Sequence, residues 1–439
     1  MGVLFRNAIL VDYASPAVRS GDLYVDKGRI SAVGKELPGS TGDDVVDCHG
    51  AVIMPGLVNG HMHLYSALAP GMPAPKQSPR NFHEILRYVW WRLDRAHNSA
   101  SIKMSGLVGA TGSLRNGVTT IIDHHASPSC IEDSLDYLSQ GIAMTGCRAV
   151  LCYEITNRNY PDEALRGLAE NERFIEKCRG NKQDRFAGMM GAHASFTLSD
   201  RSLAACAETA SRLGVGIHVH AAEDPVDEQI SRDKYGFGII ERLQNAGIFD
   251  VPETIIAHGT HFSDKDIHYI NTCKNISIAH NPRSNMNNGV GYAPVSEFVP
   301  PVMLGTDGID GNLFAELQAA VFRSHESDHH VQFDHVLKML GNSAEFVSRS
   351  LGVKVGVLEP GAAADIVLTS YIPATPINAE NLAAHFIFAL SSAPVRDVMI
   401  AGEWVLKEGK PCGYDEAEMT ARAREIAGSL WRRMQDIPL

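Results

Sequence analysis

The stretch PGLVNGHMH, residues 55–63, marks the point at which the sequence pattern changes. Before it, residues 3–56 form short apolar runs, two of which are joined by Asp26-Lys27-Gly28-Arg29, a hairpin signal. After it, strand-like apolar runs alternate with helical stretches, which is typical of a parallel sheet built from strand-helix units. The stretch itself is apolar and ends in two histidines, and it predicts the first strand of that sheet.

Eight apolar runs, each ending in a polar residue, follow one another along the chain. Most run ends are separated by about the 30 residues of one strand-helix unit. Eight such units close a (β/α)₈ TIM barrel, so we predict an α/β fold of this kind. The runs are 56–63, 117–125, 147–154, 185–193, 214–220, 253–258, 275–280 and 302–307.

The barrel predicted over residues 57–357 is flanked by further strands on both sides. Residues 1–56 and 358–412 are expected to supply the two parts of one small β-sandwich domain, and 413–439 a C-terminal helix. Within the barrel, we predict a helix that Ser199 caps and Gly214 ends, since its apolar residues recur at helical spacing between these two signals.

The composition is that of a soluble globular protein, with 44% hydrophobic and 21% charged residues among 439. The 39 basic and 51 acidic residues give a formal net charge of −12, which disfavours nucleic acid and anionic membranes as partners. We find no signal segment and no apolar run near the roughly 20 residues of a membrane span, so we expect a cytoplasmic protein. The eight cysteines form no CxxC pair, which indicates reduced thiols.

Polar residues collect at the ends of the eight runs. Six runs end in histidine, one in Glu154 and one in Asp307. Functional residues of a parallel barrel lie at the carboxyl ends of its strands, so this pattern indicates a site. His61 and His63 are two residues apart, which on a strand places both rings on one face and within reach of one ion.

Later strand ends supply further candidate ligands. HVHAAE contains His220 at the strand end and Glu223 three residues on, while His258 and Asp307 end two more runs. His218 shares the face of His220 and is either a ligand or a buried neighbour. Imidazoles and a carboxylate suit zinc or ferrous iron with one position left for water, so we expect a divalent metal, zinc first and iron as the alternative.

These residues resemble the amidohydrolase superfamily, in the branch of aminohydrolases that includes cytosine, guanine and S-adenosylhomocysteine deaminases and triazine chlorohydrolases. The resemblance spans nearly the whole chain. Its motifs are PGLVNGHMH, His220 to Glu223, AHG at His258, NPRSN from Asn281, GTDG at Asp307 and GAAADIVL. WWRLDRA (90–96), IDHHASP (122–128) and SNMNNGVGY (284–292) look like the SsnA-type aminohydrolases, named for an association with selenium metabolism that assigns no substrate.

The resemblance implies one metal ion per chain, bound by His61, His63, His220 and Asp307. It also implies that His258 hydrogen-bonds or ligates the metal-bound water, that Glu223 shuttles protons and that His193 contacts the substrate. In binuclear relatives a lysine ends the fourth strand and bridges two metals, whereas the run 185–193 contains no lysine. A single metal is therefore favoured.

The implied activity is hydrolytic deamination of a small aminated nitrogen heterocycle. A divalent ion lowers the pKa of its water from about 15.7 toward roughly 7, and the hydroxide attacks the amino-bearing carbon. Asp307 is expected to take the proton, His258 to orient the nucleophile and Glu223 to protonate the ring nitrogen before ammonia leaves. The alternative is a cyclic amide, imide or chloro-heterocycle hydrolase that uses the same metal hydroxide.

A metal-binding protein without turnover is disfavoured, because a structural metal does not require Glu223 beside its ligands. The expected partner is a small heterocyclic substrate, and we expect a homo-oligomer by analogy alone.

Several residues are candidates for substrate contact. His124 and His125 end the second run and only one of them should face the pocket; His125 is taken as the candidate. Glu154 either binds a substrate N–H group or is a solvated loop acid. Trp90 and Trp91 lie in a helical insertion, where they either pack in its core or form an aromatic lid over a planar substrate.

Three residues are candidates for contacts with the metal centre on the side away from the substrate, or with its ligand Asp307. Either His280, or Ser284 and Asn285 in the NPRSN stretch, is expected to orient Asp307 or to contact the far side of the metal.

Overall fold

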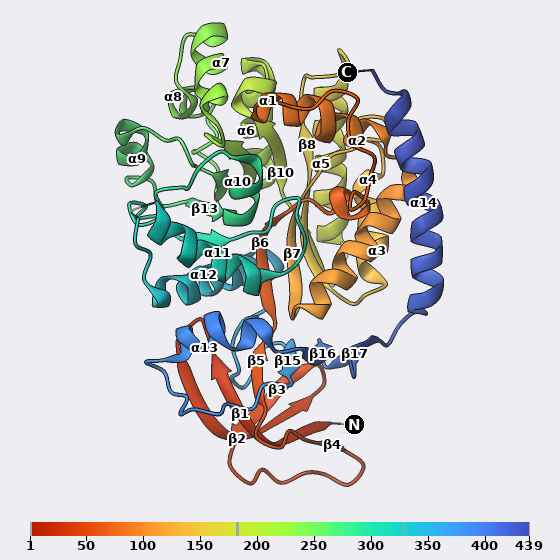
Figure 1. Cartoon of the computed structure of the whole chain (residues 1–439), viewed down its shortest axis with the longest axis vertical. Helices are drawn as coiled ribbons and strands as arrows, with labels where there is room; N and C mark the ends of the chain where they lie inside the picture. Colours follow the sequence, from red (N-terminus) through yellow and green to blue (C-terminus); the bar gives the residue numbers. More distant parts are fainter. Residues whose placement is uncertain (1, 181–183, 328, 439) are drawn as a thin grey trace.

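Eight parallel strands form a barrel in this computed structural model, which describes residues 2–180, 184–327 and 329–438 (Figure 1). The strands follow one another around the barrel in chain order. They are β6 (Leu57–Met62), β7 (Val118–His125), β8 (Arg148–Ile155), β10 (Met190–Ala194), β11 (Ile217–Ala221), β12 (Thr254–His258), β13 (Ile276–His280) and β14 (Val302–Leu304). The predicted (β/α)₈ barrel is therefore confirmed.

The barrel closes between its first and last strands. The N–H groups of Thr306 and Asp307 donate to the carbonyl of His61 at 2.9 and 3.0 Å. The run predicted over 185–193 is two strands, since β9 (Phe186–Gly188) pairs with β8 and β10 then continues the barrel. Closure at Asp307 brings the last strand end beside the first histidine pair.

Helices cover the outside of the barrel. Helix α6 (Asp200–Leu213) begins after Ser199, whose side chain accepts the N–H of Ser202, and ends at Gly214 with φ +60°. This confirms the predicted start and end. Other helices around the barrel are α3 (Ser99–Arg115), α4 (Ser134–Ala143), α5 (Glu163–Gly180), α7 (Pro225–Tyr235), α8 (Ile239–Asn245), α9 (Asp264–Ile270), α10 (Pro282–Asn288), α11 (Leu313–Glu326), α12 (Phe333–Leu351) and α13 (Leu382–Phe388).

The strands that flank the barrel in sequence join in one sheet, drawn below the barrel in Figure 1. β5 pairs antiparallel with β15, so the predicted pairing of the N- and C-terminal sets is confirmed. Phe5 and Trp404 lie four strands apart in the sheet order, yet their rings are 5.7 Å apart, which shows that the sheet curls over its own core. The strands are β1 (Val3–Asp12), β2 (Ala17–Asp26), β3 (Arg29–Gly34), β4 (Asp44–Asp47), β5 (Val52–Pro55), β15 (Ile366–Thr369), β16 (Val395–Ile400), β17 (Glu403–Lys407) and β18 (Lys410–Pro411).

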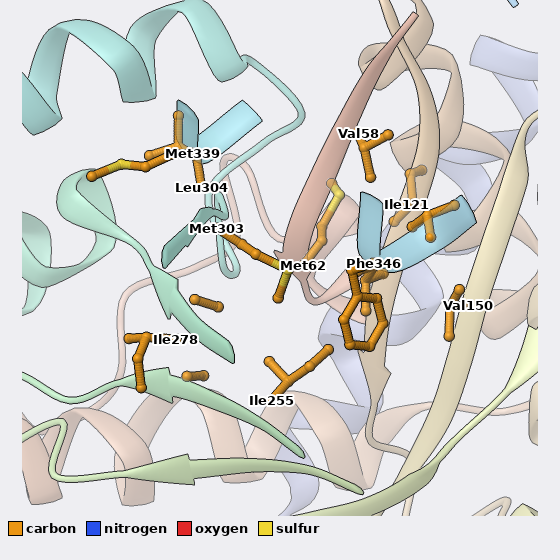
Figure 2. Packing of buried hydrophobic residues seen from close by; sticks show 14 of the residues in the cluster. Val58, Met62, Ile121, Val150, Ile255, Ile278, Met303, Leu304, Met339 and Phe346 are labelled. Atoms are coloured by element: carbon orange, nitrogen blue, oxygen red, sulfur yellow. The ribbon is translucent and has the colours of Figure 1, made fainter. Parts of the chain in front are cut away.

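Apolar side chains from the strands and from α12 form the main core. Figure 2 shows Val58, Ile121 and Ile255 from three strands near Phe346 of α12. All four side chains are at most 1% exposed. This rigid packing holds the strand ends, and with them the polar side chains beyond the core. Among the described residues, no helix combines the length and the apolar character of a membrane span.

A helical insertion follows the first barrel strand, and the last helix of the chain holds it. The insertion contains η1 (Leu64–Leu68), α1 (Phe82–Ile85), η2 (Leu86–Trp90) and α2 (Trp91–Ala96). Helix α14 (Glu416–Asp436) runs beside it in Figure 1. Arg92 is 3% exposed and donates to the carbonyls of Met434 and Ile437 at 2.8 and 3.0 Å. The N–H of Ile437 also donates to the Met434 carbonyl at 3.3 Å, and Arg92 adds further donors to the carbonyls at this end of α14.

Arg92→Met should lower the free energy of unfolding by about 1–3 kcal/mol, because the carbonyls at the end of α14 lose the donors of the buried guanidinium. It should also increase protease cleavage within α14. Urea titration and limited proteolysis measure the two effects. Arg432→Met, at an exposed position of the same helix, is the control. Equal stability of both variants would contradict the role given to Arg92.

Candidate active site

The four predicted metal ligands, together with His258, lie at the ends of the barrel strands, all on one side of the barrel. His61 lies on β6 and His63 directly follows it, while His220 lies on β11. His258 ends β12, and Asp307 follows β14. Strands distant in sequence thereby bring these five side chains to one edge.

Backbone conformation is unusual at three of these strand ends. Ala222, His258 and Asp307 have φ angles of 53°, 76° and 54°. Non-glycine residues rarely adopt this left-handed region, and such residues concentrate at functional sites. Two of the three are candidate site residues, and the third precedes Glu223.

Four of the predicted ligands converge. His63 Nε2 lies 3.0 Å and His61 Nε2 3.4 Å from Oδ1 of Asp307. The Nε2 atoms of His63 and His220 are 3.1 Å apart. Ligand atoms arranged as a tetrahedron around zinc, at about 2.0–2.1 Å from the ion, are about 3.3 Å from one another. The observed separations match such a site.

The other ring nitrogen orients each imidazole. Nδ1 of His63 lies 2.6 Å from the carbonyl of His124, and Nδ1 of His220 lies 2.9 Å from the carbonyl of His193. A carbonyl only accepts, so both Nδ1 atoms donate. In the neutral rings the lone pair is then on Nε2, toward the cluster, as metal ligation requires.

Two buried nitrogen atoms at this cluster have no hydrogen-bond partner in the part of the chain that the structure describes. They are the Nε2 atoms of His61 and His258. His61, His220, His258 and Asp307 each offer a ligand atom, and these atoms lie within 4.8 Å of one another. Buried polar atoms without partners are rare, and a cation would satisfy both nitrogens. The residues therefore fit a divalent metal with nitrogen and oxygen ligands.

A second group of ligand atoms, from His63, His124 and His220, also lies within 4.8 Å. His220 belongs to both groups but has only Nε2 available, because its Nδ1 donates to His193. One nitrogen lone pair binds one ion, and both groups need the Nε2 atom of His220. The two groups therefore cannot each hold an ion at the same time. The geometry supports a single ion.

Burial and the Asp307 carboxylate act in opposite directions on the histidines. Burial lowers the pKa of His61 to about 3. Burial is the largest single influence on His63 and disfavours its charged form, but the hydrogen bond to Asp307 and the negative charges of Asp307 and Glu154 together outweigh it and raise the pKa of His63 to about 9. A metal at neutral pH must therefore displace a proton from His63.

Glu223 lies beside the cluster. Its Oε2 is 3.5 Å from His258 Nε2, and its Oε1 accepts from Asn288 Nδ2 at 3.3 Å. Burial and the nearby negative charge of Asp307 raise the pKa of Glu223 well above its usual value. This shift favours the protonated form of the carboxyl group, the form that can donate a proton.

The NPRSN stretch supports the cluster through two side chains. Ser284 Oγ donates to Asp307 Oδ2, and Asn285 Oδ1 lies 2.9 Å from His258 Nδ1. Asn285 thus leaves Nε2 of His258 directed toward Glu223 and Asp307. His280, the other candidate for this role, instead lies against Tyr292 with ring centroids 4.9 Å apart.

A cavity of about 70 Å³ opens above the cluster. His193, Glu154 and Trp90, three predicted substrate contacts, line it. His125 does not: its Nε2 lies 3.0 Å from Ser127 Oγ. Consecutive strand residues face opposite sides, and it is the His124 ring that meets His220, with centroids 4.7 Å apart.

Glu154 is held in a buried charge network rather than in solvent. Its Oε1 lies 2.9 Å from Arg158 Nη2 and 3.3 Å from His193 Nε2. Arg158 also pairs with Asp94 at 3.2 Å. Although burial favours the neutral acid, His193, His124 and Arg158 keep the pKa of Glu154 below its usual range.

Sequence reasoning missed Arg158 and Asp94 as parts of the site. Trp91 lines the cavity, and the Arg158 guanidinium carbon lies 4.7 Å from the Trp91 ring centroid. Trp90 and Trp91 were both expected from the sequence to belong either to the core or to an aromatic lid, and both line the cavity. Asp94 and Arg158 meet across 64 residues, and no local pattern marks that contact.

His218 is a buried neighbour of the cluster. Its Nε2 lies 2.9 Å from Nδ1 of His61. If His61 ligates through Nε2, its Nδ1–H donates to this nitrogen, and His218 fixes the ring as an outer partner of a metal ligand.

His218→Phe should weaken metal affinity by about 10- to 100-fold, because His61 loses this partner. Competition with a chromogenic chelator measures the affinity. His280→Phe removes a buried histidine whose ring nitrogens have no partner among the described residues, and it should keep the wild-type affinity. Equal affinities for both variants would contradict the role of His218.

The chain resembles known proteins along almost its full length. The 5'-deoxyadenosine deaminase of Methanosarcina mazei is 25% identical, with 98% of this chain and 99% of the relative covered. The 5-methylthioadenosine/S-adenosylhomocysteine deaminase of Desulforudis audaxviator is 28% identical at the same coverages. The crystal structure of an adenosine deaminase from Xanthomonas campestris with bound zinc has a TM-score of 0.82 at 21% identity, covering 99% of each chain, which supports the fold.

The model of the amidohydrolase family matches residues 52–405. This range begins in the small sheet before the barrel and includes all eight barrel strands and every candidate metal ligand. The chain belongs to the amidohydrolase family.

Proposed function

We propose that this protein is a metal-dependent hydrolytic deaminase that removes the amino group of a small nitrogen heterocycle as ammonia. The observation that carries this proposal is the convergence of His61, His63, His220 and Asp307 beneath a cavity that Glu223 also lines. The deaminase names of the two relatives support the same reaction.

The metal would be held by His61, His63, His220 and Asp307, with zinc as the first expectation and iron as the alternative. When bound, a divalent ion lowers the pKa of a water molecule toward neutrality and so supplies a nucleophile. The zinc in the Xanthomonas campestris structure supports this choice of metal.

The remaining residues move protons and orient the substrate. Glu223 lines the cavity and its raised pKa favours a protonated carboxyl group, so it can protonate a ring nitrogen as electrons shift onto it. Asp307 accepts a proton through its carboxylate, and Asn285 fixes the ring of His258 beside both acids. His193 and Glu154 offer hydrogen-bonding atoms to the heterocycle, and Trp90 offers an aromatic face.

An ammonia-release screen tests the proposal. Zinc-loaded protein is incubated with aminated purines, pyrimidines, pterins and triazines and with nucleosides of these bases, and ammonia is measured by a coupled assay. Catalytic ammonia release from at least one compound is expected. Hydrolysis of cyclic imides or chloro-triazines without ammonia would instead favour the alternative hydrolase, and the absence of any turnover would contradict an enzymatic role for the site.

A further inference from the structure

We propose that Arg158 is a positioning residue that joins the helical insertion to the end of β8 and so fixes Trp91 relative to Glu154. Trp91 begins α2 and Glu154 lies near the end of β8, and both side chains line the cavity. Arg158 is not among the described residues of that lining, so it would act on a substrate through the two residues that it holds. The kinetic consequence of this proposal rests on the proposed function, whereas the geometric consequence does not.

One nitrogen atom of Arg158 makes both connections. Its Nη2 donates to Oδ2 of Asp94, on α2, at 3.2 Å and to Oε1 of Glu154, on β8, at 2.9 Å. The side chains of Arg158, Asp94 and Glu154 are 6%, 2% and 4% exposed. Hydrogen bonds between charged groups are stronger in such a place than in water, because little solvent competes for either partner. The bridge therefore joins the insertion to the barrel at a point nearly closed to solvent.

The rest of the guanidinium group is also held in place. Its carbon lies 4.7 Å from the centroid of the Trp91 ring, which is within the range of a cation–π contact. Its Nε donates to Oγ1 of Thr156 at 3.0 Å. Lysine could supply the positive charge, but it has neither the planar face nor the fork of donors that these contacts use. The contacts therefore favour arginine at this position.

The two bridged carboxylates differ in their other contacts. Glu154 also lies 3.3 Å from His193 Nε2 and 3.5 Å from His124 Nδ1. The carboxylate of Asp94 has no second hydrogen-bond partner among the described residues, and its Oδ1 is buried without one. Without Arg158, α2 would carry a buried carboxylate that no cation faces, which is strongly unfavourable. Whether Asp94 then moved toward solvent or took up a proton, α2 would lose its link to β8.

Helix α2 has a second attachment that does not depend on Arg158. Arg92 donates to carbonyls at the end of α14, and Nε of Arg433 donates to the carbonyl of Ala96 at 2.7 Å. Figure 1 shows α14 running along the molecule next to this part of the insertion. Loss of Arg158 should therefore leave the chain folded and change the geometry of the cavity wall.

Arg158→Met should raise KM at least about tenfold, while kcat falls by less than about threefold. Arg158 contacts neither the proposed metal ligands nor Glu223, so the chemical step is preserved, whereas a substrate held between Trp91 and Glu154 binds less well. The metal content should stay close to one ion per chain. Ammonia release from the compound that the screen identifies, on zinc-loaded protein, gives both constants.

Arg148→Met is the matched control. Arg148 begins the same strand, its side chain is 2% exposed, and it pairs with Asp365 at 2.7 Å and with Asp184 at 2.9 Å. This variant also removes a buried guanidinium group that joins two carboxylates, but at the start of β8 rather than at the cavity. It should lower stability and leave KM unchanged. Equal KM values for Arg158→Met and Arg148→Met would show a merely structural role and would overturn the proposal.

Two further variants test the bridge itself. Arg158→Lys keeps the charge without the fork of donors, so its KM should lie between those of the wild type and Arg158→Met. Asp94→Ala should raise KM although Asp94 does not line the described part of the cavity. Combined with Arg158→Met, it should add nothing further, because both substitutions remove the same link. Effects that multiply in the double variant would mean that the two residues act independently, and would overturn the proposal.

Acrylamide quenching of tryptophan emission tests the geometry without any turnover. Arg158→Met should increase the quenching, because the Trp91 ring loses the group that holds it, and Arg148→Met should not. The same substitution in a Trp91→Phe protein should give a smaller increase. Increased quenching in a protein that deaminates none of the compounds screened would reject the proposed function and support the bridge. Unchanged quenching in Arg158→Met would overturn this inference whatever the activity.

Discussion

Glu223→Gln should lower kcat by about 100- to 10,000-fold while the protein keeps one metal per chain. Glutamine preserves the size of the side chain and its contact with Asn288, but it cannot supply the carboxyl proton. Metal analysis by mass spectrometry and steady-state ammonia release on the same sample separate the two effects.

Glu228→Gln is the control for this substitution. Glu228 lies on α7, close in sequence to Glu223, but it is not part of the described cavity lining. It should retain wild-type turnover. Normal turnover in Glu223→Gln, or loss of its metal, would contradict the assignment of Glu223 as the proton donor.

His63→Ala should reduce bound metal from close to one ion per chain to a small fraction after dialysis, and activity should fall in parallel. His63 contributes a nitrogen 3.0 Å from Asp307 Oδ1, and its loss leaves the metal with three of its four proposed protein ligands. Metal content is measured after expression with supplemented zinc and after dialysis against a weak chelator.

The matched control is His280→Ala, which removes another fully buried histidine from the end of a barrel strand. It should retain its metal, since its ring lies against Tyr292 outside the cluster. Two metals per wild-type chain would contradict the competition between the two ligand groups, and full metal in His63→Ala would exclude His63 as a ligand.

The fold and much of the site chemistry could be predicted because their signals are local. Strand alternation places His61 and His63 on one face from a spacing of two, whatever lies elsewhere in the chain. The Ser199 cap and Gly214 stop likewise follow from the backbone preferences of single residues. Repetition of the strand-helix unit then determines how many strand ends reach the same edge.

The choice between His124 and His125 depended on how β7 sits in the barrel. Both residues end the same strand, and a single step in register exchanges which ring faces inward. Its pairing with β8 places His124 opposite Cys152 and His125 opposite Tyr153. No feature of the two residues themselves carries that information.

Sequence alone determined the strand-helix order, the flanking strands and the residue types available for a divalent ion, because these follow from short-range periodicity and ligand chemistry. Only the tertiary structure decided which side chains meet. Examples are the Asp94–Arg158–Glu154 network, the contact of His218 with His61 and the hydrogen bonds of Arg92 to carbonyls at the end of α14. Each joins segments far apart in the chain, and such contacts are set by barrel closure and packing, which act over distances that no local pattern encodes.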